Sequence, residues 1–317
     1  MQTLARALSC VLAVAFLACP GAGGRAAPAA RPAEGEHDGD KQALRVYHIG
    51  NSVTDTIRYP ALKEMVASAG DTYAYGRHMI PGAPLEWIFK HPDSGFKEET
   101  GYYPEALRDH AWDVLTLQPF DRQLTSDDGT GDLEVATKLI DLALPKSPGL
   151  RVYVYQRWPR RLGDEKKGYT LDYAGQWAKK YTRGWDGTNE TRDYFERLTR
   201  ALRDARPALE HPVQLVPVGD VLLELDRRMK AGQVPGFKGV EELYHDGIHF
   251  NNVGSFVVGT TFLATLYRQD PAGSDPAAYA VKKESHDGDI SAELAKAIQA
   301  CAWDVVREHP LAGVAEE

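Results

Sequence analysis

The stretch VYHIGNSVTDTIRYPALKEM, residues 46–65, joins an apolar run directly to a helix-like pattern. A strand that passes at once into a helix is typical of a parallel sheet, in which helices cross over the sheet faces. Ser52 stands at the junction. With Asp55 three residues later it is close to a capping box, so Ser52 is predicted to cap the helix. The same position lies at the sheet edge where substrates bind, so a nucleophilic role is compatible with capping.

The rest of the chain repeats this alternation. Strands are predicted at 44–50, 72–80, 112–120, 151–158 and 213–219. Helices are predicted at 55–69, 101–109, 132–144, 190–206, 221–231, 252–268 and 290–307. The pattern predicts an α/β fold, with a mostly parallel sheet of about five strands covered by helices on both faces.

The first 42 residues have the composition of a leader and a tether. Residues 1–27 combine an early arginine, a short apolar stretch and small residues, which predicts a secretory signal peptide and no membrane span. Residues 28–42 are rich in proline, alanine and charge, which predicts a flexible linker. The protein is therefore expected to be exported, to the periplasm or the medium, with lipid anchoring at Cys19 as the alternative.

The bulk composition narrows the class of function. The 317 residues are 43% hydrophobic and carry a formal net charge of -8, so a large core is expected and nucleic acid is not an expected partner. Only Cys301 lies outside the predicted leader, so it is predicted to be a small core residue rather than part of a disulfide framework. No metal-ligand spacing links the histidines, so neither a metal nor a cofactor is expected. The oligomeric state is left open.

Residues 161–189 interrupt the alternation and are predicted to be an insertion. Aromatic residues recur there at every fourth position: Tyr169, Tyr173, Trp177, Tyr181 and Trp185. On a helix they would form one stripe, which either packs an inserted helix onto the body or forms a wall beside a substrate groove. Residues 269–317 are predicted to be a helical extension that packs on the domain of residues 43–268.

A second informative stretch is YHDGIHFNNVGSFVV, residues 244–258. Asp246 and His249 stand three positions apart in a loop before a late helix, so one loop can present a carboxylate and an imidazole together. The carboxylate would orient the ring, and the other ring nitrogen would take the proton of a serine. The alternative is an aspartate in an Asx turn beside a surface histidine.

GNS after the first strand, together with DGIH before a late helix, resembles the SGNH (GDSL-like) hydrolase superfamily. The form GNSVTD is most similar to its bacterial branch with a G-N-S-x-T-D opening. The resemblance covers about residues 44–268 and implies a flavodoxin-like, three-layer α/β/α sandwich. It also implies that Ser52 is the nucleophile and that Asp246 and His249 complete a catalytic triad.

The resemblance further implies an oxyanion hole. The family uses the N–H of the nucleophile and of a glycine after the second strand, which Ser52 and Gly82 match here. The family's asparagine in G-x-N-D is absent, and Gln118 in WDVLTLQPF stands at the corresponding strand end. Its amide offers the same N–H donors on a longer arm, so Gln118 is predicted to replace the asparagine. The alternative is a polar residue that satisfies backbone groups.

Three more residues are candidates for lining the substrate site: Asn51, Arg157 and Trp158. Asn51 is also predicted to fix the turn that carries Ser52. Packing and salt bridging are the alternative roles of Arg157 and Trp158.

These features predict an exported serine esterase that hydrolyses short-chain esters, with an acylated glycan as the expected substrate. The reaction would pass through an acyl-enzyme on Ser52. Two alternatives remain open. One is an O-acyltransferase with the same triad, and the other is a non-catalytic glycan-binding protein on the same fold.

Overall fold

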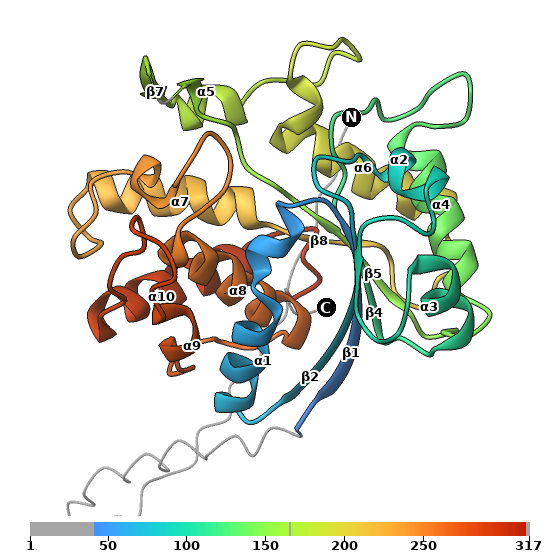
Figure 1. Ribbon diagram of the computed structural model, residues 1–317, viewed down its shortest axis with the longest axis horizontal. Helices are drawn as coiled ribbons and strands as arrows, with labels where there is room; N and C mark the ends of the chain where they lie inside the picture. The colour runs from blue at the N-terminus through green and yellow to red at the C-terminus, as the bar shows by residue number, and fades with distance from the viewer. Residues whose placement is uncertain (1–40, 165, 315–317) are drawn as a thin grey trace, which may run out of the picture. The chain divides into compact units, whose positions relative to one another are not determined.

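The strand in the opening stretch lies inside a six-stranded sheet of order β3-β2-β1-β4-β5-β8 (Figure 1). Five of its strands run parallel: β1 (Ala43–Gly50), β2 (Thr72–Met79), β4 (Val114–Leu117), β5 (Arg151–Tyr155) and β8 (Gln214–Val216). The short strand β3 (Phe96–Lys97) pairs antiparallel with β2 at one edge. This computed structural model describes residues 41–164 and 166–314. The predicted signal peptide, and the predicted linker up to residue 40, lie outside the described residues.

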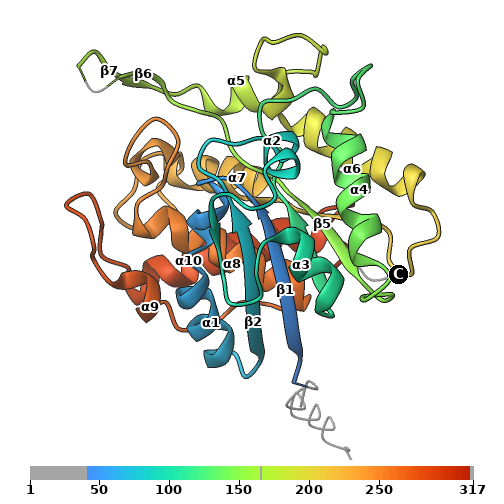
Figure 2. The same cartoon turned by 45° about the vertical axis from the view of Figure 1, so that its right-hand side comes forward.

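Helices cover both faces of the sheet (Figures 1 and 2). One layer contains α1 (Tyr59–Ser68), α7 (Val218–Lys230), α8 (Asn252–Tyr267), α9 (Ala277–Ala280) and α10 (Ala292–Glu308). The other contains α2 (Leu85–Lys90), α3 (Tyr103–Asp109), α4 (Asp132–Ala143) and α6 (Arg192–Ala205). The three-layer sandwich predicted from the sequence is confirmed, with one antiparallel edge strand added to the five predicted strands.

Helix α8 is the centre of its layer. All of its residues are buried, as expected for a helix that is apolar on every side. Helix α10 packs against α7 and α8, and its Cys301 is a free, buried thiol, as predicted for a small core residue. No helix in the described part of the chain has both the length and the apolar character needed to cross a membrane.

The insertion differs from the predicted single helix. It begins with the antiparallel pair β6 (Leu162–Asp164) and β7 (Gly168–Thr170), which projects from the body in Figure 2, and continues into the short helix α5 (Tyr173–Trp177). Gly168 and Gly187 have positive φ, which a helix cannot continue through. The prediction of one continuous aromatic stripe on a helix is therefore wrong.

The five aromatic residues of that stripe have different surroundings. The rings of Tyr173 and Trp177 are almost fully buried in the core, whereas Trp185 is 67% exposed. Tyr181 packs against the core from the loop that follows α5. The packing role thus applies to part of the insertion, and its far end presents an indole to solvent.

Candidate active site

Ser52, His249 and Asp246 form a chain of hydrogen bonds at the carboxyl edge of the sheet. Ser52 Oγ lies 2.9 Å from His249 Nε2, although 197 positions separate the two residues. His249 Nδ1 lies 2.7 Å from Asp246 Oδ2. Ser52 follows β1, and the other two residues precede α8. The structure therefore brings together the three side chains that the two sequence motifs singled out.

The turn that carries Ser52 is held by Asn51, as predicted. Asn51 Oδ1 accepts the N–H of Val53 at 3.0 Å, and Asn51 Nδ2 donates to the carbonyl of Ala83 at 3.3 Å. This amide side chain is only 2% exposed. Asn51 thus ties the Ser52 turn to the loop after β2, and its burial contradicts the additional prediction that it lines the substrate site.

Ser52 does not cap a helix, so that prediction is wrong. The predicted helix at 55–69 is divided into the 3₁₀ turn η1 (Thr54–Ile57) and helix α1, and neither begins with a side-chain cap. Arg58, between them, has a left-handed backbone with φ 51° and ends the first turn. Among the described residues, the hydrogen bond of the Ser52 hydroxyl is the one to His249. Its lone pairs are therefore not committed to a helix end.

The loop with Asp246 combines the two roles that the sequence left open. Asp246 Oδ1 accepts the N–H groups of Ile248 and His249, both at 2.7 Å, which is an Asx-type turn. Asp246 Oδ2 faces the imidazole. Partial burial acts to raise the pKa of Asp246. The two N–H groups and the His249 ring outweigh burial and lower this pKa to about 2. Asp246 is therefore a carboxylate at every pH at which the protein is expected to work.

Residues after β5 donate hydrogen bonds to backbone carbonyls of this loop. The Arg161 guanidinium donates to the carbonyl of Asp246, with Nε at 2.8 Å. The Trp158 indole donates to the carbonyl of Ile248 at 2.8 Å and stacks on Phe250, with ring centroids 4.0 Å apart. Trp158 is fully buried, so the prediction that it lines the substrate site is wrong. Arg161 was not identified from the sequence, because its contact is to a backbone atom 85 positions away.

The side chain of Arg157 also has a structural role. It is fully buried, its Nη2 donates to Glu190 at 2.6 Å, and its guanidinium lies 5.0 Å from the ring centre of Phe120. Burial lowers the pKa of Arg157, and the Glu190 carboxylate opposes this change. The salt-bridging alternative describes Arg157 better than the predicted lining role.

Two backbone N–H groups are available to hold a substrate oxygen. The loop with Gly82 is tied to the Ser52 turn, because Ile80 N–H donates to the carbonyl of Gly50 at 3.2 Å and Asn51 binds Ala83. Gly82 is exposed and has a φ of +68°, which favours glycine. Within the described residues, neither the Ser52 N–H nor the Gly82 N–H donates a hydrogen bond. Both predicted backbone donors are therefore free.

Gln118 lies in a different environment from these two donors. It is fully buried, its Nε2 donates to the carbonyl of Pro119 at 2.5 Å, and its Oε1 lies 3.5 Å from the Thr54 hydroxyl. A Cβ on Gly50 would meet the Thr54 side chain at 2.0 Å and Gln118 Cβ at 2.8 Å, so this packing requires glycine at position 50. The burial of Gln118 disagrees with its predicted role as an oxyanion donor.

For the serine-esterase mechanism that the sequence predicts, Gln118→Met is expected to lower kcat by less than about tenfold, because the amide that it removes already serves Pro119. A working oxyanion donor would cost about 10²–10³ in kcat. Steady-state hydrolysis of 4-nitrophenyl acetate measures the difference, with thermal unfolding as a check on the core. A decrease in kcat of about 10²-fold or more in a stably folded variant would show that Gln118 is an oxyanion donor.

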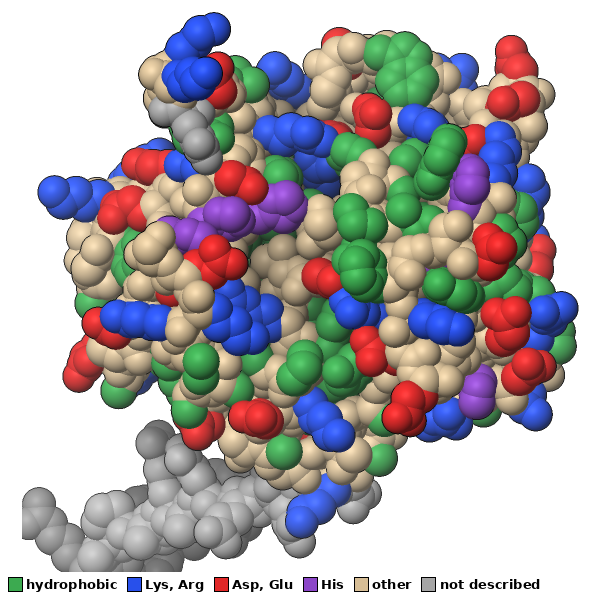
Figure 3. Space-filling model, viewed as in Figure 1, with side chains coloured by type: hydrophobic (Ala, Val, Ile, Leu, Met, Phe, Trp, Pro, Cys, Tyr) green, Lys and Arg blue, Asp and Glu red, His purple; other side chains and the backbone are tan. Residues whose placement is uncertain are grey.

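A row of histidine side chains borders the site (Figure 3). His286 stacks on His245 with ring centroids 4.2 Å apart, and His245 lies 5.9 Å from His249. Partial burial lowers the pKa of His245; Asp246 opposes this change, and the other two histidines add to it. The lowered pKa favours the neutral form of His245, which limits its competition with His249 for Asp246.

Donor atoms of His245, Asp246 and His249 lie within 4.8 Å of one another, so these three residues could hold a metal ion. In the observed arrangement, Asp246 Oδ2 is engaged by His249 Nδ1 at 2.7 Å. A metal at this point would replace the hydrogen bond that orients the imidazole. The observed geometry therefore favours proton transfer over metal binding.

Comparison with known proteins finds similarity to solved structures. No family model matches the chain, and no curated protein matches it. The structure is similar to that of a DUF4886 family protein from Bacteroides uniformis ATCC 8492, with a TM-score of 0.54 and 15% identity; the match covers 84% of this chain and 95% of that chain. A carbohydrate esterase family 3 structure from Talaromyces cellulolyticus has a TM-score of 0.42 and 13% identity, with 71% and 97% covered. The periplasmic domain of a lipopolysaccharide acetyltransferase from Salmonella ser. Paratyphi A has a TM-score of 0.40 and 11% identity, with 71% and 84% covered.

At 15% identity, the likeness to the Bacteroides uniformis protein extends to the fold alone. That fold is the α/β sandwich with a mainly parallel sheet that the resemblance to SGNH hydrolases implied. The predicted fold is confirmed at this level. Function has to be argued from the site itself.

Proposed function

We propose that this protein is an exported serine esterase that hydrolyses short-chain esters of carbohydrates. The observation that carries the proposal is the continuous chain from Ser52 Oγ through the His249 ring to the Asp246 carboxylate, with contacts of 2.9 and 2.7 Å. This geometry is what a serine needs in order to lose its proton as it attacks a carbonyl carbon.

The reaction proceeds in two halves. Ser52 Oγ attacks the ester carbonyl while His249 Nε2 takes its proton, and Asp246 stabilises the imidazolium that forms. The free N–H groups of Ser52 and Gly82 hold the negative oxygen of the tetrahedral intermediate. His249 then gives the proton to the leaving alcohol. In the second half, water attacks the acyl-enzyme while His249 takes its proton; the bond between Ser52 Oγ and the acyl carbon then breaks, His249 returns the proton to Ser52 Oγ, and the acid is released.

The openness of the site supports a substrate with a bulky alcohol portion. The side chains of His249 and Asp246 are 35% and 31% exposed, so the triad opens to the surface rather than into a closed tunnel. The insertion near it begins with a charged hairpin, with the sequence RRLGDEKKG at 160–168. Such a hairpin is unlike the apolar lid that a lipase uses to bind long acyl chains.

Hydrolysis of 4-nitrophenyl esters of increasing chain length tests the proposal. The wild-type protein is expected to hydrolyse the acetate and butyrate and to lose activity toward the long-chain esters. Absence of hydrolysis of every short ester by a folded preparation would contradict the proposal. Product analysis with added sugar acceptors separates an esterase from the O-acyltransferase alternative, because a transferase would move the acetyl group to the sugar instead of releasing acetate.

A further inference from the structure

A cavity of about 580 Å³ opens beside the first turn of α2, and none of the steps above uses it. Glu86, in the first turn of α2, lines it four positions after Gly82. Arg122 lines it from the connection between β4 and α4, and Trp185 lines it from the far end of the insertion. Gly82 and Arg122 lie in loops that leave the carboxyl ends of β2 and β4, the edge at which Ser52 stands. The cavity therefore lies on the same edge of the sheet as Ser52.

Specific contacts fix the walls of this cavity. Arg122 pairs with Glu86 at 3.0 Å, which joins the loop after β4 to α2. Leu124 N–H donates to the Tyr181 hydroxyl at 3.0 Å, and Asn189 donates to the carbonyl of Arg122 at 3.3 Å. These bonds hold the insertion against the loop after β4. The two segments lie side by side in Figures 1 and 2. These contacts therefore fix the shape of the cavity.

The lining has the chemistry of a sugar site. Trp185 exposes 67% of its surface, and the negative face of an indole favours the C–H groups on the apolar face of a pyranose ring. Asp127 and Asp128 also line the cavity. Hydrogen bonds from Ser126 and Thr130 to Asp128 Oδ1 lower the pKa of Asp128, and Oδ2 of this carboxylate can accept a hydrogen bond from a sugar hydroxyl.

The charge of the cavity selects against anions. Glu86 pairs with both Arg122 and Lys90, whereas neither Asp127 nor Asp128 forms an ion pair with any lysine or arginine of the described chain. A uronic acid or a phosphorylated sugar would be repelled by these two carboxylates, which form no ion pair, and an uncharged sugar would not be repelled.

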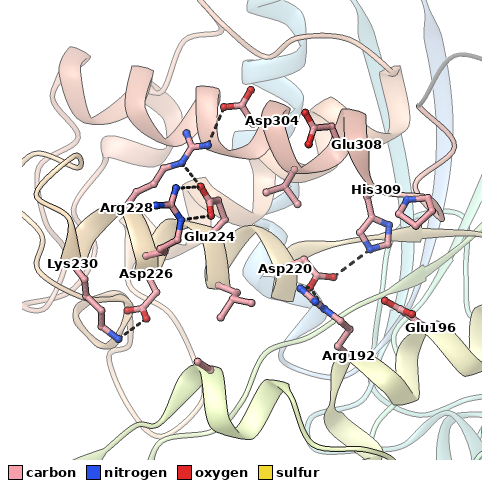
Figure 4. Close-up of a pocket in the computed structure, with 15 residues that line it drawn as sticks. Arg192, Glu196, Asp220, Glu224, Asp226, Arg228, Lys230, Asp304, Glu308 and His309 are labelled. Carbon is pink, nitrogen blue, oxygen red and sulfur yellow. Dashed lines mark hydrogen bonds and ion pairs between the residues drawn. The ribbon is translucent and has the colours of Figure 1, made fainter.

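A larger cavity, of about 850 Å³, does not offer such a site (Figure 4). It lies between α7 and α10. Its charged groups pair with one another: Arg228 bonds Glu224 and Asp304, and Arg192 bonds Asp220 (Figure 4). These pairs leave few polar groups free to recognise a ligand.

We infer that the cavity lined by Trp185 is the subsite that binds an uncharged sugar unit of the ester's alcohol portion. This inference rests on the proposed function and names the part of the substrate that the protein recognises away from the reacting carbonyl. Trp185 supplies the stacking face, and Asp127 and Asp128 accept hydrogen bonds from ring hydroxyls.

Steady-state kinetics of Trp185→Ala test the subsite with two substrates. For an O-acetylated xylo-oligosaccharide, KM is expected to rise roughly tenfold with kcat little changed, because stacking on an aromatic ring typically contributes such a factor. For 4-nitrophenyl acetate, which has no sugar, both constants are expected to stay within about twofold. Trp87→Ala is the matched control: this indole is also half exposed, stacks on His91 and does not line the cavity.

A charge variant tests the preference for neutral sugars. Asp127→Asn combined with Asp128→Asn is expected to lower KM for an O-acetylated galacturonan, which is anionic, relative to KM for the neutral oligosaccharide. An unchanged ratio would remove the electrostatic part of the inference.

These experiments distinguish failure of the proposed esterase function from failure of the proposed sugar subsite. If the wild type hydrolyses neither ester, the proposed function fails, and quenching of indole fluorescence by xylo-oligosaccharide in wild type but not in Trp185→Ala still tests the cavity. If 4-nitrophenyl acetate is hydrolysed but Trp185→Ala leaves KM for the acetylated sugar unchanged, the subsite is refuted. An equal rise of KM in Trp87→Ala refutes it as well.

Discussion

Replacing Ser52 by alanine is expected to lower kcat for 4-nitrophenyl acetate by at least about 10⁴-fold, because no other group can form the acyl-enzyme. The fold should be unaffected, since the Ser52 hydroxyl bonds only the His249 ring among the described residues. Thermal unfolding of the variant should therefore match that of the wild type.

Ser94→Ala provides the control for this experiment. Ser94 is an exposed serine in the loop between α2 and β3, and its contact with His78 uses the backbone carbonyl rather than the hydroxyl. Its loss should leave the rate unchanged. Equal rates in the wild type and Ser52→Ala would show that another group performs the hydrolysis.

Asp246→Asn is expected to lower kcat by about 10⁴-fold with little change in KM. The asparagine carbonyl can still accept the N–H groups of Ile248 and His249, so the loop should keep its shape. Its NH₂ group would face His249 Nδ1, which favours the tautomer that cannot accept the Ser52 proton at Nε2. The defect is thus one of protonation rather than of folding.

The pH profile provides a second readout for Asp246. Its pKa is lowered to about 2, so its carboxylate is present throughout the range above about pH 4. The wild-type rate should therefore show no inflection from Asp246 in that range. Asp141→Asn, which removes a carboxylate paired with Arg206, is the control and should leave kcat unchanged. A rate of Asp246→Asn within tenfold of wild type would mean that His249 does not depend on this carboxylate.

The sheet could be predicted from the sequence because it depends on short, local patterns, and the meeting of Ser52 with His249 was implied by the resemblance of GNS and DGIH to the motifs of SGNH hydrolases. Apolar runs mark the strands, and the carboxyl ends of parallel strands converge on one edge. A serine directly after β1 and an Asp–His pair before α8 are therefore expected near that edge. The separation of 197 positions does not matter, since the topology determines where the loops meet.

The errors in the site arose where tertiary packing decides the direction of a side chain. Trp158 and Arg157 stand at the end of β5, yet both point into the protein, where one supports Ile248 and the other pairs with Glu190. Gln118 directly follows β4 but is fully buried, with its Oε1 3.5 Å from the Thr54 hydroxyl. A position next to a strand end indicates proximity to the site and does not show which face the side chain takes.

The insertion could not be predicted for a related reason. Aromatic residues at every fourth position are compatible with a helix, but Gly163, Gly168 and Gly187 take backbone conformations that end one. Tyr173 and Trp177 keep the helical spacing on α5, and Trp185 does not. The exposure of Trp185 could therefore be found only in the structure.

Labelling with a fluorophosphonate, followed by peptide mass spectrometry, tests the central claim most directly. Such a probe reacts with a serine whose proton is taken by a neighbouring base. The wild-type protein is predicted to gain one adduct per chain, located on Ser52, and Ser52→Ala and His249→Ala are predicted to gain none. A folded wild-type protein that gains no adduct, or that is labelled on another residue with Ser52 unmodified, would contradict the assignment of Ser52 as the nucleophile.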